Sequence, residues 1–474
     1  MSGNFFAHQL AAAFDDLGYE TTVCEFTSQD DLDAVLSPFF GKKYRAVFDF
    51  NSLLPRLAMD DGTPVIDLID GPFYDYIVDH PLFHYNCLMT RAKNFHAIVL
   101  DEGQADYVKK YHPQVKSVHM LPLGATIALF DGEKNPADHI LFMGTYDAPE
   151  KVYDIVKAAP EPFCGMMKRI IEMRIAVPEL PMEEAFAACL KEDDMELDEA
   201  QFALFMNTMY ASDAYIRDYF RKAALDELLK KKIPVQLVGE GWEKYQTPYE
   251  RYRTIEKPVT FDLSFEKIAR EQIMLDVSPI FNRGVHDRAI AGMANRTVVL
   301  TDSNPYRCAH FKNRKDMMFY SLAKIDSLSE AAGELMENEK LRSEIRENAY
   351  QTFLCRTYLE GACKRNIVMG GRRLKQNYQK MLEETIAKNQ REERVPSLLL
   401  HSCCAPCSSY CLEYLSQYFK ITVFYYNPNI YPEEEYTKRV AEQQHFIERL
   451  PAKYPISFVE GTYDKECFMR WRAV

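Results

Sequence analysis

The chain has 474 residues, more than one hydrophobic core usually serves, so we expect two or three domains. No apolar run is long enough to span a membrane and the sequence does not start like a signal peptide, so we expect a cytoplasmic protein without membrane association. The formal net charge of −13 argues against a protein that coats nucleic acid non-specifically, but it permits a local basic patch.

The first third of the chain alternates between helical and strand-like segments. Residues 4–18 have helical spacing and end at Gly18. Short apolar runs, each closed by a polar or turn residue, follow at 19–26, 44–50, 63–70, 95–101, 115–124 and 139–147. Strands separated by helices predict a parallel sheet flanked by helices. We assign residues 1–165 to this α/β domain and expect its first strand to be missing, because the sequence opens on a helix.

The rest of the chain divides into four further segments. Residues 166–232 have a helical pattern, and a second α/β domain spans 233–375 with strands expected within 233–242, 272–281, 296–302 and 316–322. The charged stretch 376–396 ends near Pro396 and indicates a linker. A partial α/β domain follows at 397–474, with strands expected at 397–402, 420–432 and 455–461 and a helix over 433–449.

The segment 278–306, "SPIFNRGVHDRAIAGMANRTVVLTDSNPY", carries candidate binding residues of the second domain. A strand runs into a loop, and a helix begins near Asp287. A helix N-terminus attracts phosphate, and Arg283 and Arg288 could add charge-assisted hydrogen bonds. His286 could supply a polar contact to a sugar or a phosphate.

The stretches "FNRGVHDR", "GMAN" and "VLTDSNPY" resemble the donor-binding region of GT-B glycosyltransferases, closest to the CgeB family. The resemblance extends over residues 1–375 and implies a pair of Rossmann-type domains that transfers a sugar from a nucleotide-sugar donor to an unknown acceptor. It also implies donor-binding roles for a set of residues, with the first of them on the facing domain: Gly144, Gly284, His286, Asp287 and Arg288. The paired glutamates of many retaining enzymes are replaced by Arg283 and Ala291, so that donor clamp is absent.

The stretch "LLLHSCCAPCSSYC", residues 398–411, places four cysteines behind an apolar strand. Twelve cysteines are too few for a disulfide scaffold in a chain of this length, so a metal site, a reactive thiol pair and a cysteine-rich core remain open. Cys403, Cys404 and Cys407 fall in the turn before a helix, where the helix dipole favours thiolates. We expect Cys411 to pack in the core, together with the seven scattered cysteines: Cys24, Cys87, Cys164, Cys189, Cys308, Cys355 and Cys363.

The stretches "LHSCCAPCSSY" and "FYYNPNIYPEEEYTKR" closely resemble epoxyqueuosine reductases of the QueH type. The resemblance implies reduction of an epoxide on epoxyqueuosine in tRNA, a [4Fe-4S] cluster, a second iron and an electron donor. It makes Cys403 and Cys404 cluster ligands and links Cys407 to the second iron. Asn427, Asn429 and Tyr436 would lie at the active-site edge with Cys407. The family's downstream Cys-x-x-Cys pair is expected beyond Val474.

Two enzymes are therefore predicted in one chain: an amino-terminal glycosyltransferase and a carboxyl-terminal epoxyqueuosine reductase. Two alternatives stay open. Only the glycosyltransferase could be active, or the chain could be a non-catalytic scaffold that binds a nucleotide sugar or RNA.

Overall fold

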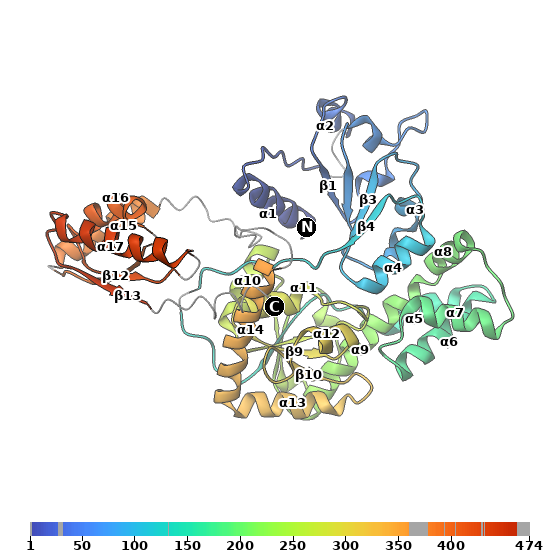
Figure 1. The fold of residues 1–474 in the computed structure, drawn as a ribbon. Coiled ribbons are helices and arrows are strands. Elements are labelled where there is room, and N and C mark those ends of the chain that lie inside the picture. Colours follow the sequence, from blue (N-terminus) through green and yellow to red (C-terminus); the bar gives the residue numbers. More distant parts are fainter. Residues whose placement is uncertain are drawn as a thin grey trace. The chain divides into compact units, whose positions relative to one another are not determined.

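The computed structural model describes residues 2–26, 32–130, 132–359, 378–392, 394–402, 404–427, 430 and 432–461. The chain forms two compact units, residues 1–372 and 373–474, which are described separately (Figure 1). The strands of the three named sheets run parallel, so the predicted α/β class is confirmed. None of the helices in these ranges is long and apolar enough to cross a membrane.

The first sheet of unit 1 has four strands in chain order. They are β1 (Val47–Phe50), β2 (Phe73–Tyr76), β3 (Phe95–Val99) and β4 (Ser117–Met120). The associated helices and short 3-10 turns are α1 (Ser2–Asp16), α2 (Leu32–Leu36), η1 (Ser37–Phe39), η2 (Leu54–Arg56), η3 (Val65–Leu68), η4 (Pro81–His84), α3 (Tyr85–Leu88) and α4 (Glu102–Tyr111).

Two of the strands predicted for this region are wrong. Residues 19–26 form no strand, and their side chains are largely exposed, so their alternating pattern buries little apolar surface. Residues 63–70 contain the 3-10 turn η3, in which the adjacent Val65 and Ile66 are both buried. A strand would send these two neighbours to opposite faces, whereas a turn lets both reach the core. The strand β2 forms just after this turn.

The second sheet of unit 1 has six strands in the order β10-β9-β8-β5-β6-β7. Its strands are β5 (Ile140–Met143), β6 (Val235–Val238), β7 (Arg253–Glu256), β8 (Ile273–Asp276), β9 (Val298–Asp302) and β10 (Met318–Tyr320). The assignment of 139–147 to the first domain is therefore wrong, because β5 pairs with both β6 and β8. Ile140, Leu141 and Phe142 are fully buried, as expected for a central parallel strand covered on both faces.

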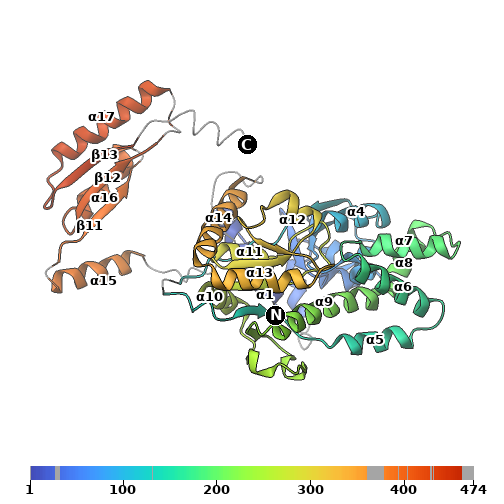
Figure 2. The ribbon, with the colours of Figure 1, turned by 90° about the horizontal axis from the view of Figure 1, so that it is seen from below.

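Helices account for most of the remaining chain in unit 1. Between β5 and β6 the chain forms α5 (Pro149–Ala158), α6 (Phe163–Ala176), α7 (Met182–Glu192), α8 (Glu199–Thr208) and α9 (Tyr210–Lys230). Figures 1 and 2 show α5 to α8 gathered into one helical group, and α5 and α6 pack against α9. The later elements are η5 (Trp242–Lys244), η6 (Glu250–Tyr252), α10 (Phe261–Arg270), α11 (Asp287–Ala294), α12 (Pro305–His310), α13 (Asp326–Glu337) and α14 (Glu339–Leu359).

A buried pair of carboxyl groups lies in the first sheet. Asp49 of β1 and Asp75 of β2 are partners in the strand register, and Asp75 is fully buried. The Ser52 hydroxyl donates to Asp75 at 2.5 Å and lies 2.8 Å from Nδ1 of His84. Burial raises the pKa of Asp49 to about 6, and burial together with the charge of Asp49 raises the pKa of Asp75 to about 7. The fold therefore favours protonated carboxyl groups here.

Unit 2 contains a three-stranded parallel sheet in the order β11-β12-β13. Its elements are α15 (Tyr378–Arg391), β11 (Ser397–His401), α16 (Ala405–Leu415), β12 (Lys420–Tyr425), α17 (Glu433–Arg449) and β13 (Ile456–Glu460). A strand forms within each of the three predicted ranges, but β12 ends at Tyr425 and not at 432; the helix over 433–449 forms as expected. The segment interpreted as a linker instead contains α15, whose Ile386 is buried with Leu412 and Val423. The charged composition of this segment led to the linker prediction, although α15 has one apolar face that includes Ile386.

Candidate functional sites

The cysteine turn connects β11 to α16. Ser402 is buried after the strand, and Cys404 is the N-cap residue of α16 in an extended conformation. The carbonyl of Cys404 accepts a hydrogen bond from the amide of Ser408 at 3.2 Å. Cys404 therefore lies at the positive end of the helix dipole, which favours the thiolate form of a cysteine.

Neutral hydrogen bonds hold this turn in place. The buried Gln443 of α17 accepts through Oε1 from the hydroxyls of Ser402 at 2.9 Å and Ser408 at 3.1 Å. Nδ2 of Asn427, which follows β12, donates to the carbonyl of Ser402 at 2.8 Å. The sequence analysis missed Gln443. Its position in the buried stripe that it shares with Tyr436 and Val440 was the available signal, because a buried amide needs partners.

A charged group also lies near the turn. Nε of Arg439 donates to Glu435 at 2.8 Å, and this hydrogen bond raises the pKa of Arg439. A thiolate at Cys404 would contribute in the same direction. The interaction is reciprocal, because a cation close to a cysteine favours the thiolate. Arg439 lies outside the set of residues that the sequence analysis proposed.

The structure brings some of the predicted residues of unit 2 together. Asn427 contacts the turn that carries Cys404. Tyr436 is buried, with its hydroxyl 3.4 Å from the carbonyl of Gly461 and its ring edge-on to Tyr425. Cys403, Asn429 and the side chain of Cys407 lie outside the described residues. Among the residues that are described, no group of three metal-ligating side chains converges.

The expected packing role of Cys411 is wrong. Its side chain is exposed on α16, because the neighbouring Leu412 occupies the buried face of the helix. Cys24 and Cys308 are also exposed, whereas the predicted burial is found for the other scattered cysteines whose side chains are described: Cys87, Cys164 and Cys189.

The second candidate site lies at the carboxyl edge of the six-stranded sheet and centres on Asp276. This fully buried carboxylate accepts from Nη1 of Arg288 at 2.9 Å and from the hydroxyls of Ser278 at 2.9 Å and Thr301 at 3.0 Å. Burial would raise the pKa of Asp276, but His286, Arg288 and a further arginine outweigh burial and lower it. Asp276 is therefore a buried anion that positions Arg288.

The residues that open α11 form a compact polar group. His286 is the N-cap residue, and its Nδ1 lies 3.1 Å from the amide of Arg288 and 2.5 Å from Oδ1 of Asp287. Nδ1 caps the helix when it is neutral and pairs with Asp287 when it is protonated. Burial opposes ionisation of Asp287, but the charges of His286 and Arg288 outweigh it and lower the pKa of Asp287 to about 2.

The loop before α11 contacts the first sheet. The guanidinium of Arg283 pairs with Asp106 at 2.9 Å and Glu102 at 3.3 Å on α4. Gly284 lies so close to the connection between β3 and α4 that a Cβ there would be 2.8 Å from the carbonyl of Leu100. These two residues join the two sheets of unit 1 at the carboxyl edges of their strands.

Two glycines shape the neighbouring strand ends. Gly239, after β6, has φ +145°, and a Cβ there would lie 2.1 Å from the carbonyl of Gly144. That carbonyl also accepts from Nε1 of Trp242 at 2.7 Å. The expectation that Gly144 lies on the facing domain is wrong, because it follows β5, which pairs with β8 in the same sheet, and Arg288 lies on α11, between β8 and β9. A Cβ at Gly144 would lie 3.4 Å from Nη2 of Arg288.

A cluster of arginines at this edge was missed. Arg217 and Arg221 lie one turn apart on α9, a spacing at which like charges repel. Burial lowers the pKa of Arg221 to about 9, and the positive charges of Arg288 and Arg217 add to this effect. Arg217 pairs with Asp218 at 2.8 Å. The edge therefore concentrates positive charge beside the N-terminus of α11, an arrangement suited to an anion.

The two units thus present two kinds of candidate site, each at the carboxyl edge of a parallel α/β sheet, where ligands of such folds bind. One site is built from arginines, glycines and a helix N-terminus, and the other from a cysteine turn.

The comparisons with known proteins divide the chain in the same way. Residues 398–473 match the family model described as "Epoxyqueuosine reductase QueH". Residues 217–360 match the model described as "Glycosyl transferase-like". The chain therefore joins a glycosyltransferase-like region to a region similar to QueH epoxyqueuosine reductases. The more specific resemblance to the CgeB family stays a prediction.

Curated relatives are similar to a short part of the chain. Epoxyqueuosine reductases QueH from Staphylococcus epidermidis and Staphylococcus aureus are each 41% identical over 96 residues, which is 20% of this chain and 40% of theirs. The reductase from Streptococcus pyogenes is 39% identical over the same length and is covered to 38%. The chain thus spans about two fifths of these relatives.

Solved structures show only a weak similarity. A sucrose-phosphate synthase from Thermosynechococcus elongatus aligns with a TM-score of 0.38 and 10% identity, covering 73% of this chain and 74% of that one. Staphylococcus aureus TarM aligns with a TM-score of 0.34 and 12% identity, covering 61% and 50%. Similarity at this level does not establish a function.

Proposed function

We propose that unit 2 takes part in reducing epoxyqueuosine to queuosine in tRNA, and that unit 1 transfers a sugar from a nucleotide-sugar donor to an acceptor. Such a tRNA substrate would place the protein in the cytoplasm. The observation that carries the reductase proposal is the position of Cys404, at the N-terminus of α16 after the strand β11, within a sequence match to QueH.

Removing the epoxide oxygen as water requires two electrons and two protons. A bound iron–sulfur cluster with a second iron would supply the electron transfer and polarise the oxygen. Thiolates are the preferred ligands of such clusters, and Cys404 fits this role because the helix N-terminus and Arg439 both favour its ionised form. We assign Cys403 and Cys407 to the same ligand group by the family resemblance.

The other residues of the turn hold it rather than react. Asn427 donates to the carbonyl of Ser402 and Gln443 accepts from its hydroxyl, and both hydrogen bonds restrain Ser402 at the end of β11. Asn427, Asn429 and Tyr436 are proposed to line the edge that receives the modified base. An external electron donor would complete the reaction.

The test of the reductase proposal is anaerobic reconstitution of the 474-residue chain with iron and sulfide. We expect iron binding that Cys404→Ala lowers, and any epoxyqueuosine reduction should fall in parallel. Cys411→Ala is the matched control and should retain iron, because Cys411 is exposed on α16. Tetrahedral zinc without iron would contradict the proposal and identify a structural metal site instead.

The glycosyltransferase proposal rests on the cluster of Arg288 and Arg221 beside the N-terminus of α11. The amides of α11 and these cations would bind the two phosphates of the donor, and Gly144 would let the donor approach the end of β5. His286 and Asp287 would contact the phosphates or the sugar. We propose that Arg283 and Gly284 hold this loop against α4, so that both sheets face the donor.

A nucleotide diphosphate should raise the unfolding temperature of unit 1, because a ligand that binds only the folded state stabilises it. Arg288→Ala should reduce this shift, measured from the unliganded variant's own unfolding temperature. Arg314→Ala is the control, since Arg314 pairs with Glu334 on the surface away from the site. Binding without sugar transfer to any acceptor would favour the scaffold alternative.

A further inference from the structure

Positively charged side chains lie at the edge of the unit 2 sheet where the strands begin, which we call the amino edge. Because the three strands run parallel, the segments that lead into them meet at one edge, opposite the cysteine turn. Each segment brings a cation to this edge: Arg394 precedes β11, Lys420 begins β12 and Lys453 precedes β13. All three side chains are exposed.

These cations are weakly neutralised. Arg394 lies 3.6 Å from Glu392, but the two side chains are 69% and 42% exposed. Ion pairs between such exposed side chains contribute little free energy. Within the described part of the chain, neither Lys420 nor Lys453 forms an ion pair. The edge can therefore offer its positive charge to a ligand.

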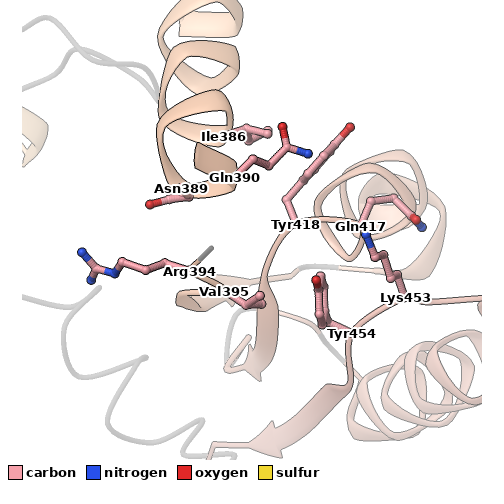
Figure 3. A pocket seen from close by; sticks show the side chains of 9 residues that line it. All are labelled: Ile386, Asn389, Gln390, Arg394, Val395, Gln417, Tyr418, Lys453 and Tyr454. Carbon is pink, nitrogen blue, oxygen red and sulfur yellow. The ribbon is translucent and has the colours of Figure 1, made fainter. Parts of the chain in front are cut away.

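A pocket of about 270 Å³ opens at the same edge (Figure 3). Two half-buried tyrosines form part of its wall, Tyr418 after α16 and Tyr454 before β13. The ammonium group of Lys453 lies 5.4 Å from the centre of the Tyr454 ring. None of the nine residues that line the pocket is acidic, and the complete set is Ile386, Asn389, Gln390, Arg394, Val395, Gln417, Tyr418, Lys453 and Tyr454.

Backbone hydrogen bonds hold the walls of this pocket. The amide of Tyr454 donates to the carbonyl of Ser416 at 3.0 Å, and the amide of Arg394 donates to the carbonyl of Asn389 at 2.9 Å. Figure 3 shows the amide group of Gln390 beside Tyr418, while the guanidinium of Arg394 points outward. The aromatic and amide groups thus belong to the pocket, and one cation extends from its rim.

We propose that this amino edge is a second RNA-binding site, which takes one unpaired base of the tRNA substrate together with its adjacent phosphates. The inference rests on the proposed reductase function. Tyrosine faces stack on bases of any sequence, amides bond to base edges and cations bind phosphates. The pocket is smaller than the ~300–1,000 Å³ that holds a drug-sized ligand, which suits a single base.

The geometry allows one RNA to reach both edges. The six residues of β12 at about 3.3 Å each make the sheet about 20 Å deep between its two edges. An RNA hairpin is long enough to contact the amino edge while its loop approaches the cysteine turn. The amino edge would then contribute affinity and orientation, and the cysteine turn the chemistry.

The experiment measures binding of a fluorescein-labelled anticodon stem-loop, with unmodified guanosine at the wobble position, to the 474-residue chain. The double variant Arg394→Ala with Lys453→Ala should weaken binding about tenfold or more and flatten its salt dependence, since each phosphate contact contributes a slope of about −0.7 for single strands. Lys315→Ala with Lys340→Ala in unit 1 is the matched control and should bind like wild type. Both lysines are exposed, and the control removes two positive charges, as the Arg394→Ala with Lys453→Ala variant does.

A second variant tests the aromatic contact. Tyr418→Ala should weaken binding about tenfold, whereas Tyr418→Phe should retain it, because stacking needs the ring and not the hydroxyl. Circular dichroism of both variants checks that unit 2 is folded. Equal binding by wild type and all variants, or no binding by wild type, would overturn the inference. Normal RNA binding without epoxide reduction would instead contradict the proposed reductase function alone.

Discussion

At the carboxyl edge of the six-stranded sheet, full charges are packed together: the fully buried Asp276 holds the half-buried Arg288, and Arg221 lies close to both. At the cysteine turn of unit 2 the buried polar groups are the neutral amides of Gln443 and Asn427. A buried ion pair is costly to break, because it leaves an unpaired charge in a medium of low dielectric constant. A neutral network can lose one member at much smaller cost. The two sites should therefore respond very differently to single substitutions.

The largest effect is expected for Asp276→Ala, which removes the fully buried anion from beside the half-buried Arg288 and Arg221. We expect it to lower the free energy of unfolding of unit 1 by about 3–5 kcal/mol. Urea unfolding followed by the fluorescence of the buried Trp242, in a Trp471→Phe background, measures this loss. Asp106→Ala breaks only the exposed pair with Arg283 and should cost about 1 kcal/mol or less. Equal losses in both variants would remove the distinction between the two kinds of pairing.

The next effect concerns the glycine contact behind the same edge. Gly239→Ala places a Cβ 2.1 Å from the carbonyl of Gly144 in a strained backbone conformation, so we expect it to cost about 2–3 kcal/mol. Gly333→Ala on α13 meets no atom within 4 Å and should stabilise the unit by about 0.5–1 kcal/mol. The same urea measurement compares the two variants. A neutral Gly239→Ala would mean that the ends of β5 and β6 can move apart.

A pH dependence is expected from the carboxyl pair of the first sheet. The folded-state pKa values of about 6 for Asp49 and about 7 for Asp75 lie above the usual value, so folding takes up protons. Stability contributed by the pair should be present below about pH 4 and should fall by at least about 2 kcal/mol as pH rises to about 7.

Urea unfolding of unit 1 at several pH values checks this dependence. Asp75→Asn should flatten it, because the amide oxygen can still accept from Ser52 while no proton is exchanged. Asp70→Asn, at an exposed position, should leave the slope unchanged. A slope that survives Asp75→Asn would assign the titration to other groups.

The smallest effect is expected for Gln443→Leu in the neutral network. The hydroxyls of Ser402 and Ser408 lose an acceptor, but both also lie near the carbonyl of Cys404, at 3.4 and 3.1 Å. The loss should therefore be about 1 kcal/mol, measured by thermal unfolding of unit 2. Gln444→Leu, exposed on the same helix, should change stability by less than about 0.5 kcal/mol. A loss above 3 kcal/mol would show that the turn depends on this amide as strongly as the other site depends on its ion pair.

The sequence was sufficient where a local pattern alone determines the element. The continuous apolar runs of β8, β9 and β12 and the helical spacing of 433–449 predicted these elements, and the turn before α16 followed from the apolar run before it. It was insufficient where tertiary packing decides. The apolar pattern of 63–70 fits a strand equally well, and only the packing of Val65 and Ile66 selects a turn.

Site residues divide in the same way. Cys404 and Asn427 could be predicted because each follows directly from a strand end at one edge of a sheet. Arg221 could not, because its role depends on which helix packs over which edge, and helix spacing alone does not specify this. Helical spacing places Gln443 on the buried stripe of α17, but it does not identify Ser402 and Ser408 as its partners. The same holds for Arg439, whose proximity to Cys404 arises from the packing of α17 beside the turn.

The position of β5 bears on how the polypeptide acquires its structure during synthesis. The four strands of the first sheet pair in chain order, so that sheet needs only local contacts and can form as soon as β4 has been made. The strand β5 is different, since its two neighbours are made only after five intervening helices and, for β8, two further strands. Until then a fully apolar strand has no partner in its sheet, and exposed unpaired strands are prone to aggregate. We expect the yield of folded unit 1 to be limited by this wait, to fall when translation is slowed after residue 143, and to improve when a chaperone is present.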